Sequence, residues 1–220
     1  MSTLDWSQID TVLLDMDGTL LDLHFDNHFW LDYLHQCHAA KHRISKEQAR
    51  AQLMPLLDSY AGTLEWYCVE FWSEKLQLPI QQMKFEQAAL IAPRPHALEF
   101  LQQLRDSGKH ALLVTNAHPL SLEVKLRQID LASNLDAIVS SHHYGFAKEQ
   151  QQFWHCLQHE HPFEPGRSLF IDDSLAVLRS AQKYGIKHLR CVATPDSTKP
   201  ARDCGEFIDG GDFVRLLQGI

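Results

Sequence analysis

The chain has 220 residues, a formal net charge of −8 and 45% hydrophobic residues. This composition is that of a folded globular protein, and the length suits one α/β domain or a core domain with an insertion. The acidic balance argues against a nucleic acid polymer or an anionic membrane surface as the main partner, because both attract basic surfaces.

The apolar runs, such as residues 11–14 and 111–114, are far shorter than a segment that crosses a bilayer. The N-terminal stretch MSTLDWSQID has neither the basic nor the apolar region of a secretory signal. The five cysteines are widely spaced and form no CxxC pair. This spacing favours reduced, mostly buried thiols and argues against a zinc site built on them. We therefore expect a cytoplasmic protein without a membrane span; the sequence does not specify its oligomeric state.

Short apolar runs alternate with helical patterns in most of the chain. Strands are expected at residues 11–14, 111–114, 137–139, 169–171 and 188–192, and helices at 96–106, 119–129, 148–158, 174–184 and 212–218. Gly108 and Gly185 follow two of these helices, as glycines at helix C-termini do. The alternation predicts an α/β fold, with a Rossmann-like parallel sheet covered by helices on both faces.

Residues 22–92 break this alternation with long helical patterns and no convincing strand. Their aromatic residues recur near helical spacing, which favours a helical core over a base-stacking platform. The segment ends at the proline-rich stretch 92–95. We predict a catalytic core of residues 1–21 and 93–220, interrupted by a helical domain of residues 22–92.

Polar residues follow the predicted strands at the point where each strand ends. They are Asp15 and Asp17, Thr115 and Asn116, and Asp172 and Asp173, with Lys148 at the start of the helix beyond a fourth strand. Ligands of open parallel sheets bind beyond the carboxyl ends of the strands, so these side chains would converge if the strands are neighbours. Four clustered carboxylates require a cation, and oxygen ligands beside a phosphate suit Mg²⁺ better than Ca²⁺. Thr115 and Lys148 could receive phosphoryl oxygens, and a carboxylate could attack phosphorus.

The segments DMDGTL (residues 15–20), Thr115-Asn116, Lys148 and Asp172-Asp173 resemble, in order, the four motifs of the haloacid dehalogenase-like hydrolase superfamily. The resemblance covers the whole chain, because residues 22–92 lie where that superfamily has a C1-type cap. It implies that Mg²⁺ is bound by Asp15, Asp172 and the backbone carbonyl of Asp17.

The resemblance also implies the roles of individual residues. Asp15 would be the nucleophile and Asp17 the general acid and then the base, aimed by a turn at Gly18 and Thr19. Asp173 would either support the metal or orient Lys148. The chain departs from the superfamily at Glu149, where proline is common. Thr115 and the backbone N–H of Asn116 would bind phosphate, and Lys148 would neutralise its developing charge.

Longer stretches, including LLDMDGTLLDLHFDNHFW, WYCVEFWSEKLQL, LLVTNAHP and LFIDDS, resemble bacterial purine nucleotidases that hydrolyse GMP and IMP. This implies a Mg²⁺-dependent phosphomonoesterase whose partner is a small-molecule phosphate ester. A phosphatase for a sugar phosphate or pyridoxal phosphate, and a phosphomutase, remain alternatives. A dehalogenase needs neither Asp17 nor the acidic pair. The histidine-rich stretches, His142-His143 and residues 155–161, are interpreted as surface histidines rather than as a metal site.

Overall fold

The computed structural model describes residues 4–218 and 220, and its centre is one six-stranded parallel sheet. The strand order is β3-β2-β1-β4-β5-β6, so β1 lies between β2 and β4. The bounds are β1 Thr11–Leu14, β2 His110–Thr115, β3 Ala137–Ser140, β4 Ser168–Asp172, β5 His188–Cys191 and β6 Ile208–Asp209. The α/β prediction is confirmed, and the short edge strand β6 is an addition to it.

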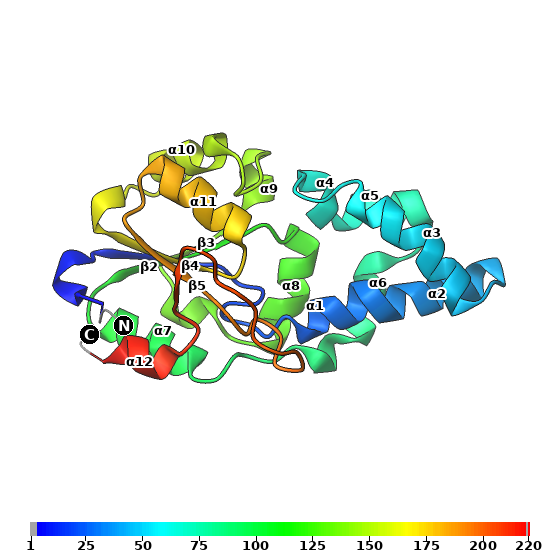
Figure 1. Cartoon of the computed structure of the whole chain (residues 1–220), viewed down its shortest axis with the longest axis horizontal. Helices are drawn as coiled ribbons and strands as arrows, with labels where there is room; N and C mark the ends of the chain where they lie inside the picture. Colours follow the sequence, from blue (N-terminus) through cyan, green and yellow to red (C-terminus); the bar gives the residue numbers. More distant parts are fainter. Residues whose placement is uncertain (1–3, 219) are drawn as a thin grey trace.

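Helices cover both faces of the sheet, as Figure 1 shows. On one face lie α7 (Ala97–Asp106), α8 (Pro119–Gln128) and α12 (Phe213–Leu217); on the other lie α10 (Gln151–Glu160) and α11 (Leu175–Tyr184). Alternate residues of β1 serve the two faces: Val12 and Leu14 pack with the first group, and Leu13 packs with the second. Burial on both sides explains why most of β1 and the middle of β2 and β4 are continuously apolar, whereas the outer strands β5 and β6 contain polar residues.

Residues 22–92 form the helical segment at one end of the molecule (Figure 1), called the insertion from here on. Its elements are α1 (His24–His28), a π-helical turn (Phe29–Tyr33), α2 (Leu34–His42), α3 (Lys46–Asp58), α4 (Leu64–Tyr67), α5 (Val69–Leu76), α6 (Ile80–Glu86) and a 3-10 turn (Ala88–Leu90). Phe29 and Trp72 are fully buried in a hydrophobic cluster that belongs to the insertion. An antiparallel β-bridge between Leu21 and Pro93 joins the segment that enters the insertion to the segment that leaves it.

Three predictions about local structure are wrong in detail. The helix predicted at 148–158 begins at Gln151, because the extended backbone of Gln150 precedes it, so Lys148 lies in a loop. A four-residue helix, α9 (Ser141–Tyr144), occupies part of the predicted loop after β3. All five cysteines are free, but only Cys191 is buried, and the other four are half-buried.

The histidines are divided. His143, His155 and His159 are exposed as predicted, whereas His142 is half-buried. Among the described residues, no helix has the length and apolar character needed to cross a membrane.

Candidate active site

The chain turns sharply after β1 at the carboxyl edge of the sheet. Gly18 has a φ of +83°, and the backbone N–H of Leu21 returns to the carbonyl of Met16 at 2.8 Å. A Cβ on Gly18 would lie 2.9 Å from both Asp173 Cγ and Pro195 Cβ. Glycine is therefore required for two reasons: it adopts the left-handed conformation, and it leaves room for Asp173.

Lys148 connects the ends of two neighbouring strands. Its Nζ lies 2.6 Å from Asp15 Oδ1 and 2.7 Å from Asp172 Oδ2, and it also donates to the carbonyl of Val114 at 3.0 Å. The lysine is 2% exposed. Strand β1 pairs with both β2 and β4, so the ends of these three strands lie side by side. Asp15, Asp172 and Lys148 therefore meet, as expected from the sequence if the strands are neighbours.

The side chain of Asn116 holds the loop that carries Lys148. Asn116 Oδ1 accepts from the backbone N–H of Lys148 at 2.9 Å, and its Nδ2 donates to Glu149 Oε2 at 2.9 Å. Tyr67 of the insertion donates to Glu149 Oε1 at 3.0 Å. Glu149, the departure from the family pattern, thus connects the insertion to the core. Thr115 Oγ1 accepts from the N–H of Ala117 at 3.0 Å, as in an ordinary strand-end turn.

Asp172 and Asp173 have different neighbours. Asp172 Oδ1 accepts from the N–H of Ser174 at 2.7 Å, and the side chain of Ser174, rather than Asp173, caps α11. Asp173 Oδ2 lies 2.8 Å from Arg202 Nη2. Asp173 therefore pairs with Arg202, whereas Lys148 pairs with Asp15 and Asp172.

The carboxylates of Asp15, Asp172 and Asp173 meet the conditions for a cation site. One oxygen of each lies within 4.8 Å of the others. Burial, opposed by Lys148 and reinforced by Asp172, raises the pKa of Asp15 to about 6. Burial and the carboxylates of Asp172 and Asp15 raise the pKa of Asp173 to about 8. Lys148 and Arg202 supply two positive charges to three carboxylates, so the cluster retains negative charge when all three are ionised, and its all-oxygen donor set fits Mg²⁺.

A second charged network, which the sequence analysis did not predict, surrounds Asp17. Lys125 Nζ lies 2.6 Å from Asp17 Oδ1 and 2.7 Å from Asp26 Oδ2, and Lys84 Nζ lies 3.1 Å from Asp26 Oδ1. Both lysines are buried, at 1% and 2% exposed. Burial would raise the pKa of Asp26, but the two ammonium groups outweigh it and lower that pKa to about 2.

The pKa of Asp17 moves in the opposite direction. Burial raises it to about 6; Lys125 opposes this rise, and the carboxylates of Asp26 and Asp15 add to it. A carboxyl group with this pKa is able to both donate and accept a proton near neutral pH.

Two cavities adjoin at Asp17. The smaller, about 130 Å³, is lined by Asp15, Asp17, Thr115, Asn116, Lys148, Asp172 and Asp173. It therefore contains every polar residue that the sequence placed at a strand end. The larger, about 320 Å³, lies mainly in the insertion, where Trp30, Trp66 and Tyr67 form part of its wall. Asp17, Leu23, Tyr67 and Ala117 line both cavities.

Comparison with known proteins identifies the family. Residues 9–185 match the family of haloacid dehalogenase-like hydrolases. The chain belongs to this family and is an enzyme of the hydrolase class. It is 39% identical over 215 residues to the GMP/IMP nucleotidase YrfG of Escherichia coli (strain K12), covering 98% of this chain and 97% of the relative. A relative of the same name in Shigella flexneri gives the same identity and coverage.

Solved structures agree on the fold. The HAD phosphatase from Thermococcus onnurineus superposes with a TM-score of 0.77 at 20% identity, over 92% of both chains. The defluorinating L-2-haloacid dehalogenase Rha0230 superposes with a TM-score of 0.66 at 16% identity, covering 99% of this chain and 98% of the other. At such identities the likeness establishes the common fold.

Four residues of the site were not predicted from the sequence: Lys84, Lys125, Asp26 and Arg202. Of these, Lys125 has a feature that the sequence shows. Lys125 shares a helix face with Ser121 and Val124, both buried. A lysine at a core-facing position of a helix is unusual, since buried lysines are almost always paired. The position of Lys125 on the helix could therefore have indicated a buried lysine, but not that Asp17 and Asp26 are its partners.

Proposed function

We propose that this enzyme is a Mg²⁺-dependent phosphomonoesterase that hydrolyses purine 5′-mononucleotides such as GMP and IMP. The observation that carries the proposal is the position of Asp17 between the two cavities. The smaller cavity, with Lys148 and Asp15, suits a phosphoryl group. The larger suits the rest of an ester, and the leaving oxygen would lie near Asp17, between them.

In the first half of the reaction, a carboxylate oxygen of Asp15 attacks phosphorus. The ester P–O bond breaks, its electron pair goes to the nucleoside oxygen, and the carboxyl proton of Asp17 is transferred to that oxygen. The products are the nucleoside and an aspartyl-phosphate on Asp15. Lys148, 2.6 Å from Asp15 Oδ1, is placed to balance the charge that develops on the phosphoryl oxygens.

In the second half, Asp17 acts as a base. Its carboxylate takes a proton from water while the water oxygen attacks the phosphorus of the aspartyl-phosphate, and the bond to Asp15 breaks. Inorganic phosphate leaves, and both aspartates return to their starting states. A pKa of about 6 for Asp17 suits a group that must change its protonation state twice in each turnover.

Asp15 and Asp172, with the backbone carbonyl of Asp17, would hold Mg²⁺, and Asp173 would support them. When bound, Mg²⁺ supplies positive charge to the phosphate oxygens. The pairing of Asp173 with Arg202 rather than Lys148 favours its role in support of the metal. Thr115 and the backbone of Asn116 would contact the phosphoryl group in the cavity that they line.

The insertion would act as a cap that selects the leaving group. Trp30, Trp66 and Tyr67 supply flat aromatic surfaces in the larger cavity, and Asn27 and Asp58 add polar groups to its wall. Aromatic surfaces with a few polar groups suit a purine base. The relatives named GMP/IMP nucleotidase support the same class of substrate.

The free cysteines support a reducing compartment such as the cytoplasm.

The test is a panel of phosphomonoesters, assayed for inorganic phosphate with Mg²⁺ and with EDTA. We expect GMP and IMP to have the highest kcat/KM, and EDTA to abolish turnover. Sugar phosphates or pyridoxal phosphate ranking as high would reject the nucleotide assignment. Isomer interconversion without phosphate release would indicate a phosphomutase, and halide release in EDTA a dehalogenase.

A further inference from the structure

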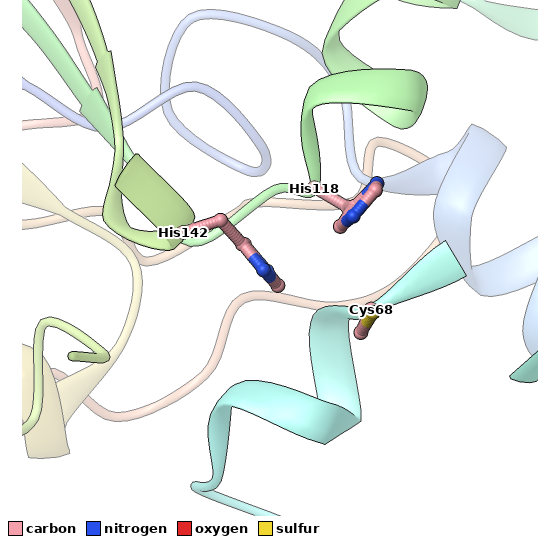
Figure 2. A group of neighbouring side chains, drawn as sticks. All are labelled: Cys68, His118 and His142. Atoms are coloured by element: carbon pink, nitrogen blue, oxygen red, sulfur yellow. The ribbon is translucent and has the colours of Figure 1, made fainter. Parts of the chain in front are cut away.

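A second group of metal-ligand side chains lies outside the Asp15 cluster, where the insertion meets the core. Cys68 is at the N-terminus of α5, His118 is at the N-terminus of α8, and His142 is in α9. One ligand atom of each lies within 4.8 Å of the others, and Figure 2 shows the three side chains around a common space. We propose that Cys68, His118 and His142 bind a transition-metal ion, best fitted by Zn²⁺.

His142 is in the state that a metal ligand requires. Its Nε2 is buried and has no hydrogen-bond partner among the described residues. Burial lowers the pKa of His142 to about 4, His118 adds to this effect, and a hydrogen bond with the backbone of Asn116 opposes it. The ring is therefore neutral, with one nitrogen engaged by a backbone group and the lone pair of Nε2 free. Metal-binding histidines commonly have this arrangement.

The other two side chains are held in position by backbone groups. His118 is 8% exposed, and its Nδ1 accepts from the N–H of Leu120 at 3.3 Å, a long contact that would be replaced when the Nδ1 lone pair binds an ion. The sulfur of Cys68 accepts from the N–H of Phe71 at 3.4 Å. The two imidazole rings lie 4.7 Å apart, centroid to centroid. Small adjustments of side chains that are already close would bring the three donors around one ion.

The donor set selects the ion. One sulfur and two imidazole nitrogens suit Zn²⁺ and similar transition metals, whereas the all-oxygen set of the Asp15 cluster suits Mg²⁺. Glu70 Oε2 lies 3.7 Å from His118 Nε2, so this 74% exposed carboxylate is placed to orient the His118 ring. A water would complete a tetrahedral site.

An ion at this location would connect the insertion to the core. Cys68 belongs to the insertion, and both histidines belong to the core. Tyr67, the residue before Cys68, lines both cavities. An ion bound here would fasten the insertion to the core next to this tyrosine. The lack of a CxxC pair argued against a zinc site built on the cysteines. The proposed site uses one cysteine and two histidines from three separate elements, which spacing along the chain does not reveal.

Co²⁺ provides a direct test, because a thiolate bound to Co²⁺ gives a charge-transfer absorption that oxygen ligands do not. The EDTA-treated, dialysed full-length protein is titrated with Co²⁺ in excess Mg²⁺, which occupies the oxygen site. We expect stoichiometric growth of the charge-transfer band together with the intense visible absorption of tetrahedral Co²⁺, and reversal of both by Zn²⁺.

Matched variants locate the site. Cys68→Ser should abolish the charge-transfer band, and Cys37→Ser, which changes another half-buried cysteine of the insertion, should keep it. His142→Gln should weaken Co²⁺ binding at least about tenfold, whereas His143→Gln, at the exposed next position, should not. Far-ultraviolet circular dichroism in EDTA establishes that each variant is folded.

Two results would overturn the proposal: no charge-transfer band in the wild-type protein at millimolar Co²⁺, or a band that survives Cys68→Ser. If Cys68→Ser does not fold, unchanged Co²⁺ affinity in His142→Gln has the same consequence. None of these readouts depends on turnover, so the metal site and the proposed phosphatase activity can fail separately.

Discussion

Asp15 and Asp17 are two residues apart, yet each is paired with a different buried lysine. Asp15 contacts Lys148 from the loop before α10, and Asp17 contacts Lys125 from α8. Burial raises the pKa of both aspartates to about 6, against the attraction of these lysines. Each proposed catalytic aspartate therefore has its own buried counter-ion, although the Asp15 carboxylate also contributes to the raised pKa of Asp17.

Replacing the proposed nucleophile should remove turnover. We expect Asp15→Asn to lower kcat at least about a thousandfold, because an amide cannot form the aspartyl-phosphate. Phosphate release from GMP measures this, and circular dichroism establishes that the fold is retained. Asp106→Asn, an exposed position on α7, is the control. A wild-type rate in Asp15→Asn would remove the assignment.

Lys125 should set the pH dependence of the reaction. Its positive charge lowers the pKa of Asp17, so Lys125→Met should raise that pKa. Asp17 would then stay protonated to higher pH, and the alkaline limb of the kcat/KM profile should move up by about one to two pH units. Lys183→Met, an exposed lysine on α11, should leave the profile unchanged. An unmoved limb in Lys125→Met would show that Asp17 does not control it.

At the scale of elements, the turn after β1 depends on Gly18. Gly108 is a matched reference: it also has a positive φ, of +71°, but a Cβ there would meet nothing within 4 Å. Gly108→Ala should therefore cost about 1 kcal/mol of unfolding free energy through backbone strain alone. Gly18→Ala should cost about 2–4 kcal/mol, because it also displaces Asp173 or Pro195.

Urea unfolding measures both variants, and GMP hydrolysis measures the effect on the site. We expect activity to fall in Gly18→Ala and to remain in Gly108→Ala. Equal destabilisation by the two substitutions would mean that the close approach of Asp173 has no energetic importance.

The elements also show where local pattern is sufficient. All five principal strands were predicted, four of them from apolar runs, because burial on both sheet faces requires continuous apolar sequence; β5 contains His188 and Arg190. The start of α10 was misplaced, since the Lys148 N–H bonds to Asn116 rather than entering a helix. That bond joins residues on two different loops, and no local periodicity indicates it.

For the whole molecule, the carboxylate cluster makes stability depend on pH and on Mg²⁺. The pKa of Asp173 is raised from 3.8 to about 8, first by burial and then by Asp172 and Asp15. The folded state therefore binds this proton more tightly than the unfolded state. Without Mg²⁺, the free energy of unfolding should fall as the pH rises from about 4 to about 8, by at most about 1.4 kcal/mol per pH unit from this group.

Urea unfolding across this pH range, with and without Mg²⁺, measures the effect. Mg²⁺ should stabilise the protein more at pH 8 than at pH 5, because it favours the ionised carboxylates. Asp173→Asn should flatten the metal-free profile, and Asp203→Asn, an exposed control, should not. A profile that rises with pH in metal-free buffer would contradict this account.

The α/β fold, the principal strands and the polar residues at their ends were all predictable from local sequence, because buried strands are apolar and end where polar residues begin. The contacts that those polar residues make became visible in the folded structure. The pairing of Asp17 with Lys125, the bridge from Tyr67 to Glu149, and the meeting of Cys68 with two core histidines all join distant parts of the chain. The first depends on how α8 packs beside the turn after β1, and the other two depend on how the insertion packs against the core. Spacing along the chain does not reveal such packing.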